Sequence, residues 1–172
     1  MSQAAMIDSA DYPNVGAALA AGFATPEGKY PAMDHECSIR STKPGALNAV
    51  EGGADGAGII PIVRESVTNL NFIVLRALYV YHDLGPAEKL SLVQLIRDEM
   101  KSDVSWKFVL YFTIPLWVGC EETKTIVQWS DALGVPLRTL ERRSGDASKI
   151  LGRLRGRAFD AADKALRLRG KL

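Results

Sequence analysis

The sequence predicts an all-α protein, and its apolar periodicity, its helix-ending residues and its basic last segment carry that prediction. Apolar residues recur at spacings of three and four over residues 59–81, 86–101 and 147–168, which is the period of an amphipathic helix. Gly85 and Pro86 separate the first two runs, as such residues do where one helix ends and the next begins. The last run is basic around a narrow apolar stripe, which is typical of a helix exposed on one side.

Residues 1–58 differ in composition from the rest of the 172-residue chain. They hold 8 of the 15 glycines and 4 of the 8 prolines, and the apolar residues of their most helix-like patch, residues 15–23, are mostly alanine. Such a segment buries too little area to recover an ordering entropy of about 1 to 2 kcal/mol per residue. We therefore expect a flexible, disordered N-terminal tail over residues 1–58 and a single helical domain over residues 59–172.

Residues 59–119 are expected to form the helical core of that domain. The apolar stripe over residues 59–81 predicts one helix, and the next run predicts a second. A third begins near Ser102 or Asp103, either of which suits an N-cap. This third segment is apolar nearly all round and belongs at the centre of the fold, although its β-branched and aromatic content also permits a strand. Pro115 should kink or end it.

Residues 125–143 read TIVQWSDALGVPLRTLERR, the pattern of two helices joined by a tight turn, within an expected helix-turn-helix and basic helix over residues 120–172. Gly134 fits the turn because glycine adopts positive φ without steric cost. Pro136 suits the first turn of the second helix, where a missing amide hydrogen has no intrahelical partner. Leu140 anchors this second helix, and the residues expected to face outward are Leu137, Arg138, Thr139, Glu141 and Arg142.

The last predicted helix, residues 147–168, has a heptad-like apolar seam. The seam consists of Ala147, Leu151, Leu154, Ala158, Ala161, Ala165 and Leu168. Gly152 and Gly156 weaken the helix by roughly 1 kcal/mol each relative to alanine. Small seam residues and glycines four apart allow a neighbouring helix to approach closely, either within the monomer or across a dimer.

Charge is divided unevenly along the chain. Residues 1–123 hold 9 Lys or Arg against 15 Asp or Glu, whereas residues 124–172 hold 12 against 5. The basic part indicates an anionic partner, with nucleic acid the first candidate and an acidic protein surface or an anionic membrane behind it. Its aromatic residues, which would stack on single-stranded nucleic acid, are only Trp129 and Phe159, so duplex DNA is favoured over RNA.

Patterns for catalysis, metal binding and membrane insertion are not found in the sequence. It has no GxSxG, phosphate-loop or HExxH motif, so neither an enzyme nor a cofactor is expected. The adjacent Asp-His-Glu-Cys of residues 34–37 rarely converges on one ion, so no metal is expected. Cys37 and Cys120 are interpreted as free thiols of a reducing cytoplasm. The most apolar run, residues 108–118, is shorter than the roughly twenty residues that a bilayer requires, so no membrane partner is expected.

The turn LGVPLRTLERR resembles the helix-turn-helix of AraC-type activators, in which a glycine, a valine and an Arg-Thr-Leu-Glu-Arg-Arg-like run begin the recognition helix. The matching residues are Leu133, Gly134, Val135, Arg138, Thr139, Leu140, Glu141, Arg142 and Arg143. The resemblance is confined to residues 125–143, without a second copy of the motif or a jelly-roll pattern. A helical core, one helix-turn-helix and a basic helix are also similar to sigma-region-4-like and phage antitermination-type regulators.

These observations predict a DNA-binding transcription regulator of bacterial, phage or mobile-element origin, with a recognition helix around residues 136–144. The residues expected to read bases in the major groove are Arg138, Thr139, Glu141 and Arg142. The residues expected to contact phosphates are Arg143, Lys149, Arg153, Arg155 and Arg157.

Two further partners follow from this hypothesis. One recognition helix reads few base pairs, so a homo-oligomer is expected, joined through the seam or through residues 106–118. RNA polymerase is a second candidate partner. The alternative function is a non-enzymatic interaction or assembly subunit whose basic helix docks on an acidic partner.

Overall fold

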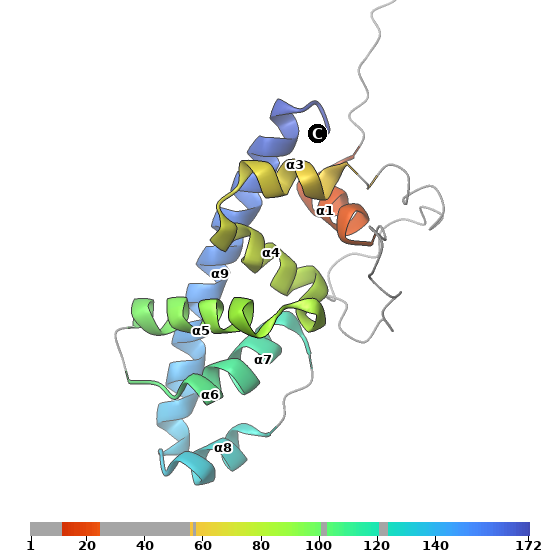
Figure 1. Ribbon diagram of the computed structural model, residues 1–172. Helices are drawn as coiled ribbons and strands as arrows, with labels where there is room; N and C mark the ends of the chain where they lie inside the picture. Colours follow the sequence, from red (N-terminus) through yellow and green to blue (C-terminus); the bar gives the residue numbers. More distant parts are fainter. Residues whose placement is uncertain (1–11, 25–55, 57, 101–102, 121–123) are drawn as a thin grey trace, which may run out of the picture.

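The computed structural model describes residues 12–24, 56, 58–100, 103–120 and 124–172. Every regular element in these ranges is helical, which confirms the all-α prediction. The longest helix, α9 (Leu137–Leu168), forms the spine of the molecule, and its 32 residues span about 48 Å at 1.5 Å per residue (Figure 1). In the described part of the chain, no helix combines the length and the apolar character needed to cross a membrane.

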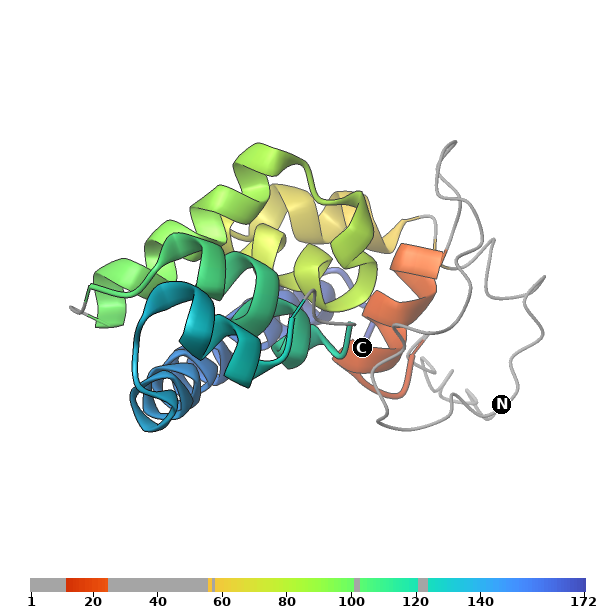
Figure 2. The same cartoon turned by 90° about the horizontal axis from the view of Figure 1, so that it is seen from below.

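The shorter helices divide along this spine. Beside its C-terminal half lie α1 (Val15–Ala24), α3 (Ile59–Ser66) and α4 (Asn69–Val80). Beside its N-terminal half lie α5 (Pro86–Met100), the helical segment 106–118 and α8 (Ile126–Leu133). The view from below shows these helices gathered on one side of α9, so its other side faces solvent (Figure 2).

α9 joins two elements that the sequence separates. The predicted recognition helix over residues 136–144 and the predicted basic helix over residues 147–168 are one continuous helix. The break expected between them is wrong because burial continues at helical spacing through the junction, from Leu140 to Ser144 and Ala147. Gly145 costs helix propensity there, but the packing on both sides of it outweighs that cost.

The apolar seam of α9 faces the protein's own helices. Its buried residues are Leu140, Ser144, Ala147, Ile150, Leu151, Leu154, Ala158, Ala162, Ala165 and Leu166. Toward the C-terminus, the buried residues are Ala162 and Leu166 in place of the predicted Ala161 and Leu168. Leu168 is 77% exposed. An α-helix of 3.6 residues per turn drifts by about 20° per heptad, so a straight helix cannot keep a strict seven-residue seam buried. Of the two expected packings, the seam therefore takes the one within the monomer.

Residues 12–24 are part of the core, so the prediction of a tail through residue 58 is wrong for this stretch. Ala18 and Leu19 of α1 are completely buried, and the ring of Phe23 stacks on Tyr79 of α4 at 5.2 Å between centroids. A Cβ on Gly22 would lie 3.0 Å from side-chain atoms of Ile59. The small residues of α1, which bury little area themselves, thus allow it to approach α3 closely. The other residues of the expected tail, 1–11, 25–55 and 57, lie outside the described ranges.

The stripe over residues 59–81 forms two helices rather than the predicted single one. Val67 has extended backbone dihedrals and ends α3, and Thr68 caps α4 by accepting a hydrogen bond from the Asn71 amide. A short 3-10 turn, η2 (Tyr81–Asp83), then leads to α5, which begins at Pro86 as predicted.

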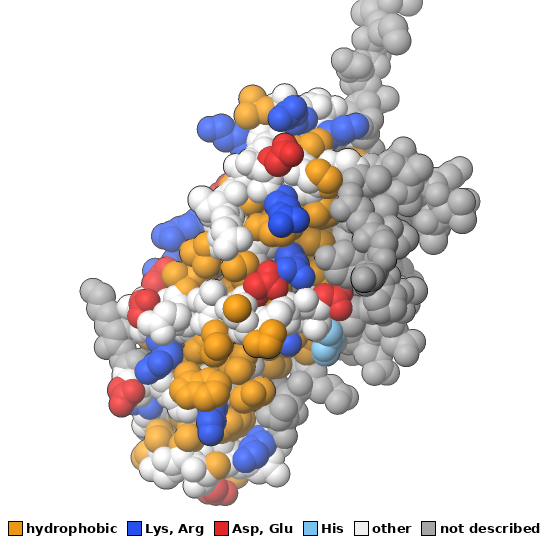
Figure 3. Space-filling model, viewed as in Figure 1, with side chains coloured by type: hydrophobic (Ala, Val, Ile, Leu, Met, Phe, Trp, Pro, Cys, Tyr) orange, Lys and Arg blue, Asp and Glu red, His pale blue; other side chains and the backbone are white. Residues whose placement is uncertain are grey.

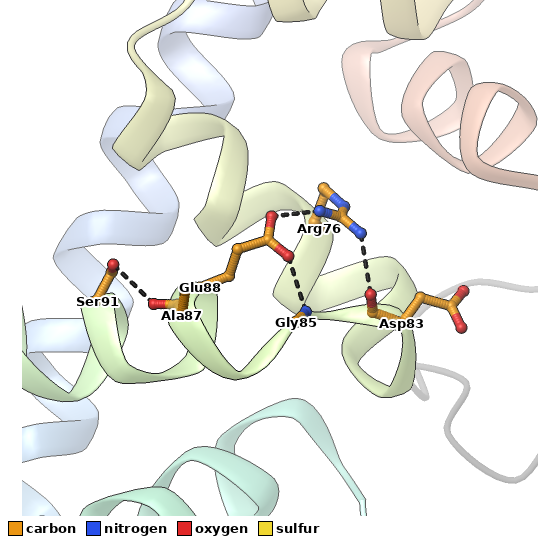
Figure 4. A network of polar contacts seen from close by, with 6 residues as sticks. All are labelled: Arg76, Asp83, Gly85, Ala87, Glu88 and Ser91. Carbon is orange, nitrogen blue, oxygen red and sulfur yellow. Dashed lines mark hydrogen bonds and ion pairs between the residues drawn. The ribbon is translucent and has the colours of Figure 1, made fainter.

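A polar network fixes the corner between α4 and α5 (Figure 4). Glu88 accepts a hydrogen bond from the Gly85 amide at 2.9 Å and forms an ion pair with Arg76. Arg76 also donates to the Asp83 carbonyl at 3.1 Å. Both charged side chains are largely buried. Each balances the charge of the other, and each makes a hydrogen bond to a backbone group of the turn.

The segment 106–118 is helical rather than a strand. It consists of α6 (Trp106–Phe108), a π-helical turn η3 (Val109–Thr113) and α7 (Ile114–Val118). Ser105 holds the N-cap position in place of the predicted Asp103, and Ser102 lies outside the described ranges. Pro115 sits in the first turn of α7, where it does not end the helix. Because proline cannot donate to the carbonyl four residues earlier, the wider π turn before it removes that conflict.

Removal of a buried side chain from α1 should destabilise the whole protein. Leu19→Ala is expected to lower the free energy of unfolding by about 2 to 5 kcal/mol, because Leu19 is completely buried. The matched control is Leu168→Ala, on a side chain that is 77% exposed, which should change it by no more than about 0.5 kcal/mol. Urea denaturation followed by circular dichroism measures both. Equal effects of the two variants would place α1 outside the cooperative core.

The corner network makes a separate contribution to stability. Glu88→Gln keeps the shape of the side chain but removes the charge that faces Arg76, and should cost about 1 to 3 kcal/mol. Glu65→Gln makes the same change on an exposed side chain of α3 and should be nearly neutral. Thermal and urea unfolding compare the two. A neutral Glu88→Gln variant would show that the corner does not need the ion pair.

Candidate nucleic-acid interface

α8 is a short helix with a complete N-terminal cap. Thr125 Oγ1 accepts from the Gln128 amide at 3.3 Å, and Gln128 Oε1 accepts from the Thr125 amide at 2.9 Å. This reciprocal capping box satisfies two amides that have no intrahelical partner. Trp129 is 6% exposed, and its ring meets that of Phe108 edge to face at 5.9 Å. The cap and this contact fix α8 against the core, and the Thr-x-x-Gln spacing of the cap is a signal that the sequence itself carries.

The turn between α8 and α9 has the conformation that the glycine predicts. Gly134 has φ 62° and donates to the Asp131 carbonyl, while the Val135 amide donates to the Ser130 carbonyl at 3.2 Å. Ser130 Oγ donates back to the Val135 carbonyl at 2.7 Å. Pro136 occupies the cap position, and α9 begins at the next residue. The carbonyl groups at the end of α8 are therefore satisfied by the turn itself.

The first turns of α9 place the predicted base-reading residues around its exposed side. Leu140 is 1% exposed and anchors the helix, as predicted. Arg138, Glu141 and Arg142 are exposed, and Thr139 is half-buried at the edge of the packed side. In Figure 1 this end of α9 lies at the tip of the molecule, where α8 crosses it steeply.

Three of the five predicted phosphate-contacting residues continue the same exposed line. Together with the two arginines of the first turns they define the basic strip, which consists of Arg138, Arg142, Lys149, Arg153 and Arg157. Spacings of four and seven keep these residues on one side of an α-helix. From first to last the strip covers 19 residue steps, or about 29 Å.

Two members of the strip have acidic neighbours. Lys149 Nζ lies 3.5 Å from Asp146, and Arg153 Nη2 lies 3.0 Å from Glu99 of α5. All four side chains are at least partly exposed, so water and salt screen these pairs and a phosphate can replace the carboxylate at little cost. After the strip, the exposed Asp160 interrupts the cations on the same side of α9, and beyond it Lys164 is exposed and Arg167 is paired with Asp163.

The remaining two predicted phosphate contacts lie elsewhere. Arg155 is two residues from Arg153, or about 200° around the helix, and its guanidinium lies over the Phe159 ring at 5.4 Å. Burial raises the pKa of Tyr79 to about 12, and the charge of Arg155 partly offsets that rise, so Arg155 is turned toward α4. Arg143 is half-buried beside the packed side. The structure therefore does not bring Arg155 together with the strip, and it holds Arg143 at the strip's margin.

A pocket away from the basic strip contains a cysteine and a histidine. Cys120 Sγ lies 3.7 Å from His82 Nε2, at a pocket also lined by Ala77, Tyr81 and Val118. Throughout the part of the chain that the structure describes, no three His, Cys, Asp or Glu side chains are grouped to hold a metal ion. Residues 34–37, which include Cys37, lie outside that part. The candidate functional site is thus the charged surface of α9, the basic strip.

Comparison with known proteins adds nothing on function to what the basic strip indicates. No protein-family model matches the chain, and no curated protein and no solved structure matches it.

Proposed function

We propose that this protein binds duplex DNA as a transcription regulator, with the N-terminal turns of α9 in the major groove. The observation that carries the proposal is the continuity of the basic strip, which begins in the helix-turn-helix and follows the solvent-facing side of α9. No other helix in the described ranges combines an exposed tip with a line of cations of this length.

The dimensions of the strip fit a groove and the backbones beside it. The major groove is about 12 Å wide and admits an α-helix, whereas the strip extends over about 29 Å. Arg138 and Arg142 therefore read bases, and Lys149, Arg153 and Arg157 reach phosphates outside the groove. Such contacts give affinity with a steep salt dependence and little sequence choice.

Base reading belongs to the side chains around the first two turns. An arginine fork can donate two hydrogen bonds to the O6 and N7 acceptors of guanine. Glu141, on one side of this pair, accepts from cytosine or orients an arginine, and Thr139, on the other, contacts a base or its methyl group. This assignment agrees with what the AraC-type resemblance of residues 125–143 implies.

The proposal extends to a homodimer, joined through a surface other than the buried seam and residues 106–118, and to an origin in a bacterium, a phage or a mobile element. A single recognition end contacts few base pairs, and a two-fold pair doubles the site. The competing interpretation is an assembly subunit whose basic strip docks on an acidic surface, for example of RNA polymerase, without reading DNA. Sequence discrimination separates the two, because an acidic protein surface does not select a base sequence.

Direct readout predicts a loss of sequence discrimination on removal of two arginines. The full chain should enrich one duplex motif from a random library, and Arg138→Ala with Arg142→Ala should lower the ratio of specific to random binding by about 100-fold or more. The control is Arg64→Ala with Arg169→Ala, which removes equal charge at the opposite end of the molecule and should keep the ratio. Equal enrichment by both double variants would refute readout by α9.

If phosphate contacts are limited to the basic strip, removing a cation inside the strip and removing one outside it should change the salt dependence of DNA binding differently. Lys149→Gln should reduce the slope of the logarithm of the binding constant against the logarithm of salt concentration by about 1. Arg155→Gln removes the same charge on the side of α9 turned toward α4, and should leave the slope unchanged. Anisotropy titrations of a labelled duplex at several salt concentrations measure both. Equal slopes for the two variants would contradict a contact limited to the strip.

A further inference from the structure

The segment formed by α6, η3 and α7 exposes large apolar side chains. Trp106 is 41% exposed, Tyr111 is 43% exposed and Leu116 is 48% exposed. Figure 3 shows hydrophobic side chains gathered over this segment, between α5 and α8. The other face of the segment is fully used, because Phe108, Phe112 and Ile114 fill the core. These three side chains therefore form the apolar part of the segment's outer surface.

Three lysines surround this apolar surface. Lys107 Nζ lies 5.7 Å from the centroid of the Trp106 ring, on the segment itself. On the side of α5, Lys89 Nζ lies 4.8 Å above the ring of Tyr81. On the side of α8, Lys124 Nζ lies 5.4 Å above Trp129.

Lys89 and Lys124 lie beside the segment, because the aromatic residues that they cover, Tyr81 and Trp129, both contact it. The Tyr81 hydroxyl donates to the Leu110 carbonyl of η3 at 3.3 Å. Trp129 packs edge to face on Phe108 of α6. A fully exposed acid, Asp103, lies nearby at 4.0 Å from Arg97. The rim of this surface, which we call the lysine-rimmed face, therefore carries three lysines.

We propose that the lysine-rimmed face binds an acidic amphipathic helix of a partner protein. Tryptophan and tyrosine at the centre with charged residues at the rim is the usual anatomy of a protein interface. From Trp106 to Leu116 the segment extends over ten residue steps, or about 15 Å, which equals roughly three turns of a docked helix. The apolar side of that helix covers Trp106, Tyr111 and Leu116, and its glutamates or aspartates meet the lysines.

Two other occupants fit the face less well. In a two-fold pair of this chain the same positive rims would face each other, which opposes association. Single-stranded nucleic acid requires several open aromatic rings for base stacking, but Trp129 is 6% exposed and Lys107 Nζ lies over the Trp106 ring. The partner is distinct from the duplex DNA of the basic strip, so this proposal does not depend on DNA binding.

A synthetic peptide tests the proposal with the full chain. The probe is a fluorescein-labelled helical peptide of three heptads, with leucine on one side and glutamate on the other. A matched peptide carries glutamine in place of glutamate. At about 0.1 M salt the glutamate peptide should bind at least about ten-fold more tightly, as judged by anisotropy.

Variants of the face and of the distant strip locate the binding. Trp106→Ala and Leu116→Ser should each weaken binding of the glutamate peptide by about ten-fold, and Lys107→Gln should reduce its advantage over the glutamine peptide by about three-fold. Arg142→Gln with Lys149→Gln, on α9, should leave the affinity unchanged. Unchanged melting temperatures are expected for the exposed positions and confirm folding.

Four results would overturn the proposal. They are equal affinity for the two peptides, loss of binding in the α9 variant, displacement of the peptide by an oligothymidine strand, and sedimentation as a dimer that Trp106→Ala dissociates. The last two would assign the face to single-stranded nucleic acid and to a second copy of the chain, respectively.

Discussion

The buried stripe of α9 is the surface on which the other described helices depend. Each of them is short, and short helices gain most of their stability from packing an apolar side against a partner. α9 supplies the partner along its whole length, from Leu140 beneath α8 to Leu166 at the other end. Alanines such as Ala158 and Ala162 keep the stripe narrow and let neighbouring helices approach closely. An uninterrupted spine therefore matters more to this fold than any single contact.

Burial on one side of α9 decides what the other side can do. The side turned from the core has no packing role, and a Cβ added at Gly145, Gly152 or Gly156 would meet nothing within 4 Å. Long cationic side chains stand between these glycines, with their charged groups in water. Because the recognition end and the spine are one helix, the cations of the basic strip are held in a fixed line. That line, more than net charge, favours a regular polyanion as the partner.

The sequence predicts elements well where local signals and packing agree, as in α8, its glycine turn and the start of α5. It fails where packing decides. The helix of Val15–Ala24 has too little apolar area to be stable in isolation, and it is held because α1 packs on α3 and α9, with Gly22 close to Ile59 of α3. The apolar stripe of residues 59–81 continues across the break at Thr68, since both helices bury the same side. The spacing of apolar residues therefore does not indicate where the first helix ends. Composition alone groups Arg155 with Arg153, whereas helical geometry places them on opposite sides of α9.

The two proposed surfaces share one support. α6 carries the lysine-rimmed face on its outer side and Phe108 on its inner side, and Phe108 packs against Trp129 of α8. α8 in turn holds the first turns of α9 through the Ser130 and Gly134 turn. A helix docked on the lysine-rimmed face therefore contacts the same packed unit, formed by α6, α8 and the turn into α9, that positions Arg138 and Arg142. Binding at one surface can change affinity at the other only if this unit has a second arrangement, and the close packing of the buried Phe108 and Trp129 rings opposes one. The two proposed surfaces should accordingly bind their partners independently.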